Sequence, residues 1–180
     1  MGWSKLSAVQ LTRPEQTEFL DKLAQLVPFP VVVPSGTRSM EAQVDALFTK
    51  ADIGGLQELK DIYPDDFAVQ IWEAYPDKDA ALEVVQADVA AGRGSAHLSG
   101  LAVDLRTRDL SSAQIELLEK ASQQAGGIPF LELVPPHLHV RLIGQPSTPT
   151  SGSSTAKKKQ GWVILALLVL VGIAAGRGER

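Results

Sequence analysis

The spacing of apolar residues predicts a helix, a short strand and a second helix in the first third of the chain. Apolar positions three and four apart follow Pro14 and indicate the first helix. Its stripe comprises Phe19, Leu20, Leu23 and Leu26. The valines at 31–33 stand between prolines, as is typical of a short buried strand. A helical pattern over 39–50 follows, so Arg38 lies where the strand gives way to the helix.

Residues 50–94 predict two or three short helices that are broken at Pro64 and Pro76. Three aromatic residues fall in this region: Tyr63, Trp72 and Tyr75. They could wall a substrate groove, but aromatic residues at such spacing also form hydrophobic cores. Both interpretations stay open from the sequence.

The next part of the chain combines period-two segments with one helix. Alternation in LAVDLR predicts a strand that carries Asp104. The segment SSAQIELLEKASQQAGG predicts a helix with serine at its start and glycine after its end. A hairpin is expected to follow, with PFLELV as its first strand, Pro135-Pro136 at the reversal and HLHVRL as its second strand.

The composition changes after residue 145. Residues 146–160 are rich in Pro, Ser, Thr and Lys and predict a flexible linker. Residues 161–176 are uncharged and mostly apolar, which predicts a transmembrane helix with the lipid bilayer as its partner, and 177–180 form a charged tail. The sequence thus predicts a domain over 1–145 that is localised to a membrane by a single-pass C-terminal anchor.

Charge and cysteine content narrow the functional classes. Acidic side chains outnumber basic ones in residues 1–145, and the whole chain has a formal net charge of −4. An acidic domain argues against a nucleic-acid partner, because phosphate binding needs clustered positive charge. The chain has no cysteine, which excludes disulfides and thiolate metal sites.

All three histidines of the chain lie in two short segments, SAHLSGLAVD and HLHV. Period-two alternation places His137 and His139 on one face of a strand, and His97 precedes the strand that carries Asp104. Imidazoles together with a carboxylate suit a Zn²⁺ ion that keeps one position open for water. Ordinary surface or core histidines are the alternative, but their clustering beside an aspartate favours the zinc site.

SAHLSGLAVD resembles the S-x-H-x-x-G-x-A-x-D signature of the zinc D-alanyl-D-alanine carboxypeptidases, a family that includes L-alanyl-D-glutamate endolysins and shares its fold with hedgehog signalling domains. The segments VVVPSGTRSMEAQVDAL and AGGIPFLELVPPHLHVRL are similar to the family's strand with S-G-x-R-S and to its closing hairpin. The resemblance implies an α+β fold in which helices flank a small antiparallel sheet. The C-terminal transmembrane helix is added to that fold.

The same resemblance implies roles for individual residues. His97, Asp104 and His139 match the metal ligands, and His137 would stabilise an oxyanion or water beside them. Arg38 matches an arginine that contacts substrate near the metal. A guanidinium can bind a carboxylate through two parallel hydrogen bonds, and peptidoglycan stem peptides present such groups. A salt bridge to a local acidic residue is the alternative role for Arg38.

The general base is the point at which this sequence departs from its relatives. Endolysins and dipeptidases have an acidic residue three positions before the last ligand, where this chain has Pro136, and hedgehog domains have a glutamate six positions before it. Glu132 lies seven positions before His139 and is the candidate base, because it is the only acidic residue between Glu119 and Glu179. The one-residue offset would turn Glu132 to the wrong face unless a bulge restored the register.

These features predict a membrane-anchored zinc peptidase that cleaves peptidoglycan stem peptides, as a carboxypeptidase or an endopeptidase. Such a protein would suit a membrane-containing bacteriophage, with the anchor in the virion membrane. The alternative is a membrane-anchored binding or structural protein that keeps the fold and the zinc without turnover. The position of the Glu132 carboxylate distinguishes the two.

Overall fold

The computed structural model describes residues 2–133 and 135–143, and these form five helices and five strands. The strands are β1 (Trp3–Lys5), β2 (Val31–Val33), β3 (Ala102–Arg106), β4 (Gly127–Leu133) and β5 (Pro136–Leu142). The helices are α1 (Pro14–Leu26), α2 (Met40–Ile62), α3 (Asp65–Ala74), α4 (Lys78–Ala90) and α5 (Ser112–Gln124). Met1–Ser147 forms one compact unit.

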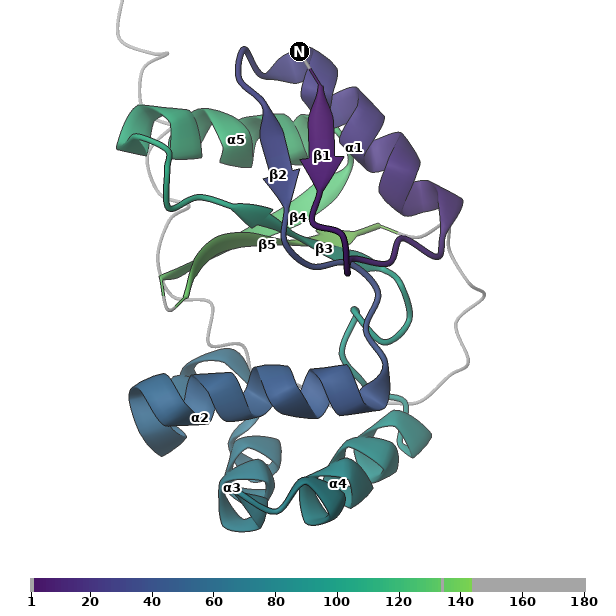
Figure 1. The fold of residues 1–180 in the computed structure, drawn as a ribbon, viewed down its shortest axis with the longest axis vertical. Helices are drawn as coiled ribbons and strands as arrows, with labels where there is room; N and C mark the ends of the chain where they lie inside the picture. The colour runs from purple at the N-terminus through teal and green to yellow at the C-terminus, as the bar shows by residue number, and fades with distance from the viewer. Residues whose placement is uncertain (1, 134, 144–180) are drawn as a thin grey trace, which may run out of the picture. The chain divides into compact units, whose positions relative to one another are not determined.

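Two sheets are present in the described residues, where a single antiparallel sheet was expected. Strands β3, β5 and β4 form an antiparallel sheet with β5 in the middle. Strands β1 and β2 form a separate parallel pair, and the expectation of one sheet is corrected on this point. The parallel pairing follows from chain connectivity, because α1 carries the chain back between the two strands so that both run the same way (Figure 1).

The helices predicted from Pro14 and after Ser111 are confirmed as α1 and α5. Together with the two sheets they enclose one hydrophobic core, to which β3 and β5 contribute Val103, Leu105, Leu138, Val140 and Leu142. Buried Gln16 of α1 donates from Nε2 to the carbonyl of Ala102 at 3.0 Å, which ties the helix to the start of β3.

Helices α2, α3 and α4 enclose a second core of their own, and Figure 1 shows them grouped together away from the sheets. The breaks predicted at Pro64 and Pro76 are confirmed, since α3 and α4 begin just after these prolines. Helix α2 is longer than predicted and bends at Gly55, which has a φ of 65°. Glycine adopts a positive φ without steric penalty, so Gly55 allows the kink within α2.

No helix among residues 2–133 and 135–143 is long and apolar enough to cross a membrane. The longest, α2, carries charged side chains along its length and is kinked, so it lacks the continuous apolar surface that a span requires. The fold class is therefore corrected to an α+β protein without a transmembrane helix in its described part, and the predicted membrane localisation is corrected with it. The predicted span at 161–176 lies outside the described residues, as do the linker 146–160 and the tail 177–180.

Candidate metal centre

One face of the antiparallel sheet carries the predicted metal ligands and the predicted catalytic carboxylate. Asp104 of β3 lies directly opposite His139 of β5, and Phe130 of β4 continues this row across the sheet. In the next row Glu132 lies directly opposite His137. Because side chains alternate along each strand, both rows project from the same face, which we call the site face. The opposite face is buried in the first core.

His97 reaches the site face from a turn that precedes β3. The His97 carbonyl accepts hydrogen bonds from the backbone N–H groups of Arg38 at 3.1 Å and Gly100 at 3.2 Å. Gly100 has a φ of 69°, a left-handed conformation that glycine adopts without strain. The serine-glycine turn noted in the sequence therefore fixes the backbone on which the His97 imidazole is mounted.

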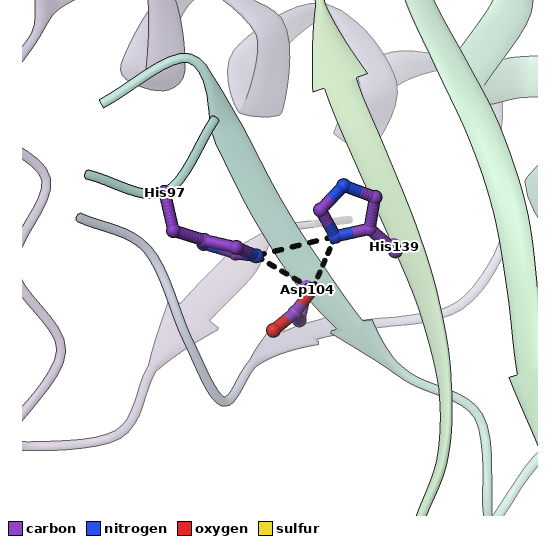
Figure 2. A group of neighbouring side chains, drawn as sticks. All are labelled: His97, Asp104 and His139. Atoms are coloured by element: carbon purple, nitrogen blue, oxygen red, sulfur yellow. Dashed lines mark hydrogen bonds and ion pairs between the residues drawn. The ribbon is translucent and has the colours of Figure 1, made fainter. Parts of the chain in front are cut away.

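The three predicted ligands converge on one point, as Figure 2 shows. His97 Nε2 lies 3.2 Å from both Asp104 Oδ1 and His139 Nδ1, and His139 Nδ1 lies 3.0 Å from Asp104 Oδ1. Ligand atoms about 2.0 Å from a tetrahedral ion would be about 3.3 Å apart, so this triangle is close to the size that such an ion requires. The group can hold a metal ion.

Hydrogen bonding sets the protonation of the His97 ring. Its Nδ1 lies 2.6 Å from the Gly36 carbonyl, so Nδ1 carries the proton and donates it there. The other ring nitrogen, Nε2, then faces Asp104 Oδ1 and His139 Nδ1. A backbone carbonyl that orients a ring in this way is a common outer partner of a metal-bound histidine.

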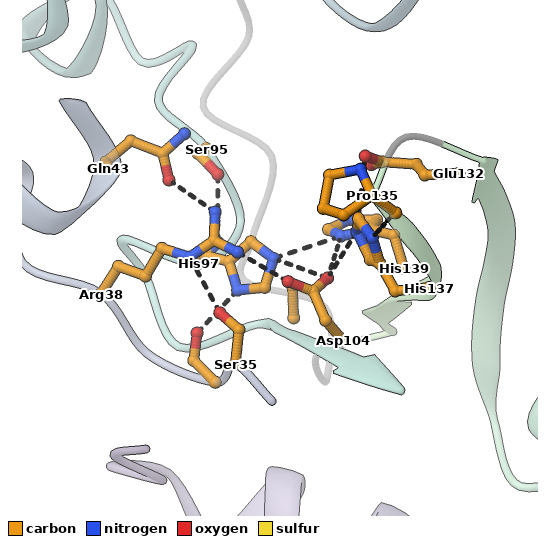
Figure 3. Close-up of polar contacts among 12 residues, drawn as sticks. Ser35, Arg38, Gln43, Ser95, His97, Asp104, Glu132, Pro135, His137 and His139 are labelled. Atoms are coloured by element: carbon orange, nitrogen blue, oxygen red, sulfur yellow. Dashed lines mark hydrogen bonds and ion pairs between the residues drawn. The ribbon is translucent and has the colours of Figure 1, made fainter. Parts of the chain in front are cut away.

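Arg38 is bound to the metal-ligand group itself. Its Nη2 donates to Asp104 Oδ2 at 2.6 Å, and its Nε and Nη1 donate to Ser35 Oγ at 2.8 Å and Gln43 Oε1 at 3.3 Å (Figure 3). Arg38 thus forms a salt bridge, but its acidic partner is Asp104, which lies 66 positions along the chain, and not a local residue. Arg38 also lines the cavity described below.

Asp104 is buried, and its charge is compensated on several sides. Burial by itself would raise the pKa of this carboxyl, but hydrogen bonds from His139 and His97 and the charges of His97 and Arg38 hold the pKa well below its usual range. The carboxylate is thus ionised across the physiological range, which is the form that binds a cation.

Glu132 is on the site face with an uninterrupted strand register, although the sequence predicted that it would need a bulge to get there. In an antiparallel hairpin the turn length decides which residues share a face, and the turn between Leu133 and Pro136 pairs Glu132 with His137. His137 Nε2 lies 3.4 Å from Glu132 Oε2 and 3.6 Å from Asp104 Oδ1. Its Nδ1 lies 2.6 Å from the Pro135 carbonyl, so the ring is oriented between the two carboxylates.

Lys50 was not identified from the sequence, yet its Nζ forms a buried ion pair with Glu132 Oε2. Lys50 lies on the face of α2 that also carries Gln43, Leu47 and Ala51, all of them buried. A lysine on an otherwise buried face of a helix rarely occurs without a partner, and this was the available signal. Neighbouring Tyr63 remains a neutral phenol, because burial and the charge of Glu132 raise its pKa to about 12.

A cavity of about 1330 Å³ opens over the site face. Tyr63 lines it, as one of the two interpretations of the aromatic residues proposed. Trp72 and Tyr75 instead stack on each other with ring centroids 5.9 Å apart, and Tyr75 packs edge-on against Phe48 at 5.0 Å. Tyr75 packs against the second core whereas Trp72 is exposed, and neither of them lines this cavity.

The chain matches no protein-family model, and no curated protein or solved structure is significantly similar to it. The case for a function therefore rests on the residues and on their geometry.

Proposed function

We propose that this protein is a zinc-dependent peptidase that cleaves the stem peptides of peptidoglycan. The observation that carries the proposal is the arrangement on the site face, where Asp104 and His139 of the three-ligand group lie in the row next to the Glu132–His137 pair. Catalytic zinc sites commonly use three protein ligands and leave the fourth position to water or substrate. The cavity over the site face provides room for a peptide at that position.

Zinc is the metal that suits the donor set best. Two imidazoles and one carboxylate with no thiolate are typical ligands of catalytic zinc, and the triangle of ligand atoms fits tetrahedral geometry. When bound, zinc supplies a Lewis acid that polarises a carbonyl and makes water nucleophilic near neutral pH.

Glu132 and His137 are the groups placed to move protons beside the metal group. The Glu132 carboxylate would accept the proton of the attacking water and return it to the leaving amine. His137 donates from Nδ1 to the Pro135 carbonyl, so its Nε2 is the atom that faces the reaction. In its protonated form, Nε2–H would donate to the negative charge that develops on the substrate carbonyl oxygen.

Arg38 has two roles in this proposal. Its contact with Asp104 Oδ2 leaves Oδ1 turned toward the two histidines, so it orients a metal ligand. Each terminal nitrogen of a guanidinium has two N–H groups, and Gln43 Oε1 and Asp104 Oδ2 each accept from one of these nitrogens. The N–H groups that remain can bind a substrate carboxylate at the cavity wall, as the sequence suggested.

A zinc-binding protein without turnover is the second candidate, and the Lys50–Glu132 ion pair favours it. The Glu132 carboxylate already accepts a hydrogen bond from the Lys50 ammonium group, which leaves it less free to contact an attacking water. Under this alternative the same cavity would bind a peptide and release it unchanged.

Digestion of purified peptidoglycan by the full-length chain with zinc tests the proposal. Glu132→Gln should lower the cleavage rate about 10²- to 10⁴-fold while the bound metal stays stoichiometric. Glu116→Gln, which changes an exposed glutamate paired with Lys120, is the matched control and should leave the rate unchanged. Fragment masses identify the bond: release of D-alanine indicates a carboxypeptidase, and cleavage after L-alanine indicates an endopeptidase. A zinc-loaded wild type that is inert on several wall types would support the binding protein instead.

A further inference from the structure

The site face continues beyond the metal ligands into a third row, which has no part in the chemistry above. This row contains Ile128 of β4, Arg141 of β5 and Ala102 of β3 as direct neighbours. The metal row therefore has the Glu132–His137 row on one side and the Arg141 row on the other. Ile128 and Arg141 line the same cavity as the metal ligands.

Arg141 has the properties of a binding residue more than of a structural one. It is exposed, whereas its strand neighbours Val140 and Leu142 are buried in the first core. Among residues 2–133 and 135–143 no acidic group forms an ion pair with it. Arg13, which lines the same cavity, is instead paired with Glu15 at 3.8 Å.

The surface on β4 beside Arg141 and His139 is apolar. Phe130 lies beside His139 in the metal row and Ile128 lies beside Arg141, and their exposed fractions are 52% and 45%. Two exposed apolar side chains on one strand next to a charged group form a surface that suits a small aliphatic side chain and an anion at once. Arg141 is two residues from His139, about 7 Å along the strand, a span of roughly two residues of an extended peptide.

We propose that Arg141 determines substrate specificity by binding a carboxylate that lies within one or two residues of the scissile bond, while Ile128 and Phe130 contact the aliphatic side chain between them. The inference rests on the proposed function. It adds Arg141 to Arg38 as a residue that binds a substrate carboxylate, with Arg38 also bonded to Asp104. A peptide can carry that carboxylate at its C-terminus or on an internal residue.

Two pairs of synthetic peptides distinguish these sources. The first pair ends in D-alanyl-D-alanine with a free or an amidated C-terminus. The second contains an L-alanyl-γ-D-glutamyl bond with the glutamyl α-carboxylate free or amidated. For the full-length zinc protein we expect amidation to lower kcat/KM about 10- to 100-fold in one pair, because a charge-assisted hydrogen bond to Arg141 is lost.

Arg141→Gln should remove this discrimination, so that acid and amide are cleaved at similar, low rates. Arg141→Lys keeps the positive charge and should retain part of the discrimination. Arg93→Gln is the control, since Arg93 is bonded to Asp88 and does not line this cavity. Equal losses on acid and amide in Arg141→Gln, or no preference for the acid in the wild type, would overturn the assignment.

The same peptides are also titrated into the zinc protein by calorimetry, which separates this inference from the proposed catalysis. If nothing is cleaved but the wild type binds an acid more tightly than its amide and Arg141→Gln does not, the specificity assignment stands and the peptidase proposal fails. If the wild type binds none of the four peptides, the specificity assignment is wrong.

Discussion

Asp104 is the residue on which the polar contacts of the candidate site converge. Its Oδ1 faces His97 and His139, and its Oδ2 is bonded to Arg38. A buried carboxylate is tolerated only when its charge is compensated, and here the compensation comes from three different segments of the chain. The residue that would bind the metal is therefore also the one that holds the site together.

The Lys50–Glu132 ion pair is a second buried charge pair, and its removal should be measurable as lost stability. Lys50→Met leaves the buried Glu132 charge without its ammonium partner, so we expect the free energy of unfolding to fall by about 3 kcal/mol or more. Lys50→Met combined with Glu132→Leu should recover most of this loss, because neither charge remains. Urea unfolding followed by circular dichroism measures both effects.

Lys78→Met is the matched control for that experiment. Lys78 pairs with Asp45, and both side chains are mostly exposed, so its removal should change stability by less than about 1 kcal/mol. If Lys50→Met and Lys78→Met lowered the free energy of unfolding equally, the Lys50–Glu132 pair would contribute no more than an exposed ion pair.

Sequence reasoning brought the candidate metal ligands together because much of their information is local. Alternation in HLHV puts His137 and His139 on one face, and the Gly-rich turn before the strand explains why His97 can approach Asp104. The choice of His139 over His137 came from the family resemblance. The partner of Glu132 was not predictable in this way, since Lys50 lies 82 positions earlier on another element. The face of Glu132 was also missed, because it depends on the hairpin turn and not on the spacing from His139 alone.

At the scale of elements, the same contrast separates helices from sheets. The apolar spacing and the start signals of these segments predicted α1 and α5 correctly, because the signals of a helix lie within its own sequence. Strand β1 was not predicted, because its pattern of two exposed residues and one partly buried residue offers no periodicity. It becomes a strand through its pairing with β2, which is a contact between distant segments.

The turn that carries His97 makes an element-scale prediction. Gly100→Ala puts a side chain on a residue with a φ of 69°, and the new Cβ would lie 3.1–3.2 Å from atoms of Arg13, Thr12 and Thr37. We expect a loss of stability of about 1–2 kcal/mol, and metal affinity about tenfold lower as the His97 backbone shifts. Competition with a chromogenic chelator measures the affinity.

Gly92→Ala is the control for this turn. Gly92 has a φ of 74°, so alanine is strained there too, but a Cβ would meet nothing within 4 Å. Stability should therefore fall by a similar amount while metal affinity stays the same. Unchanged affinity in Gly100→Ala as well would mean that the turn does not position the His97 ring.

On the scale of the whole molecule, the candidate site is where two separate cores meet. Helices α2–α4 form one core, and the sheets with α1 and α5 form the other. Polar contacts that cross between them include Arg38 with Asp104 and Lys50 with Glu132. Folding of the two cores is thus coupled through the same side chains that would hold and serve the metal.

Zinc should therefore stabilise the whole described unit and not the site alone. A ligand that binds only the folded state adds RT ln(1 + [L]/Kd) to the free energy of unfolding, which is about 2.7 kcal/mol at a free zinc concentration 100-fold above Kd. We expect zinc to raise the free energy of unfolding of the full-length chain by this amount, as measured by urea unfolding followed by circular dichroism. Unfolding should remain one cooperative transition. His97→Ala removes a ligand and should abolish the shift, whereas His137→Ala should retain most of it. A zinc shift that persists in both His97→Ala and Asp104→Ala would locate the binding site elsewhere in the chain.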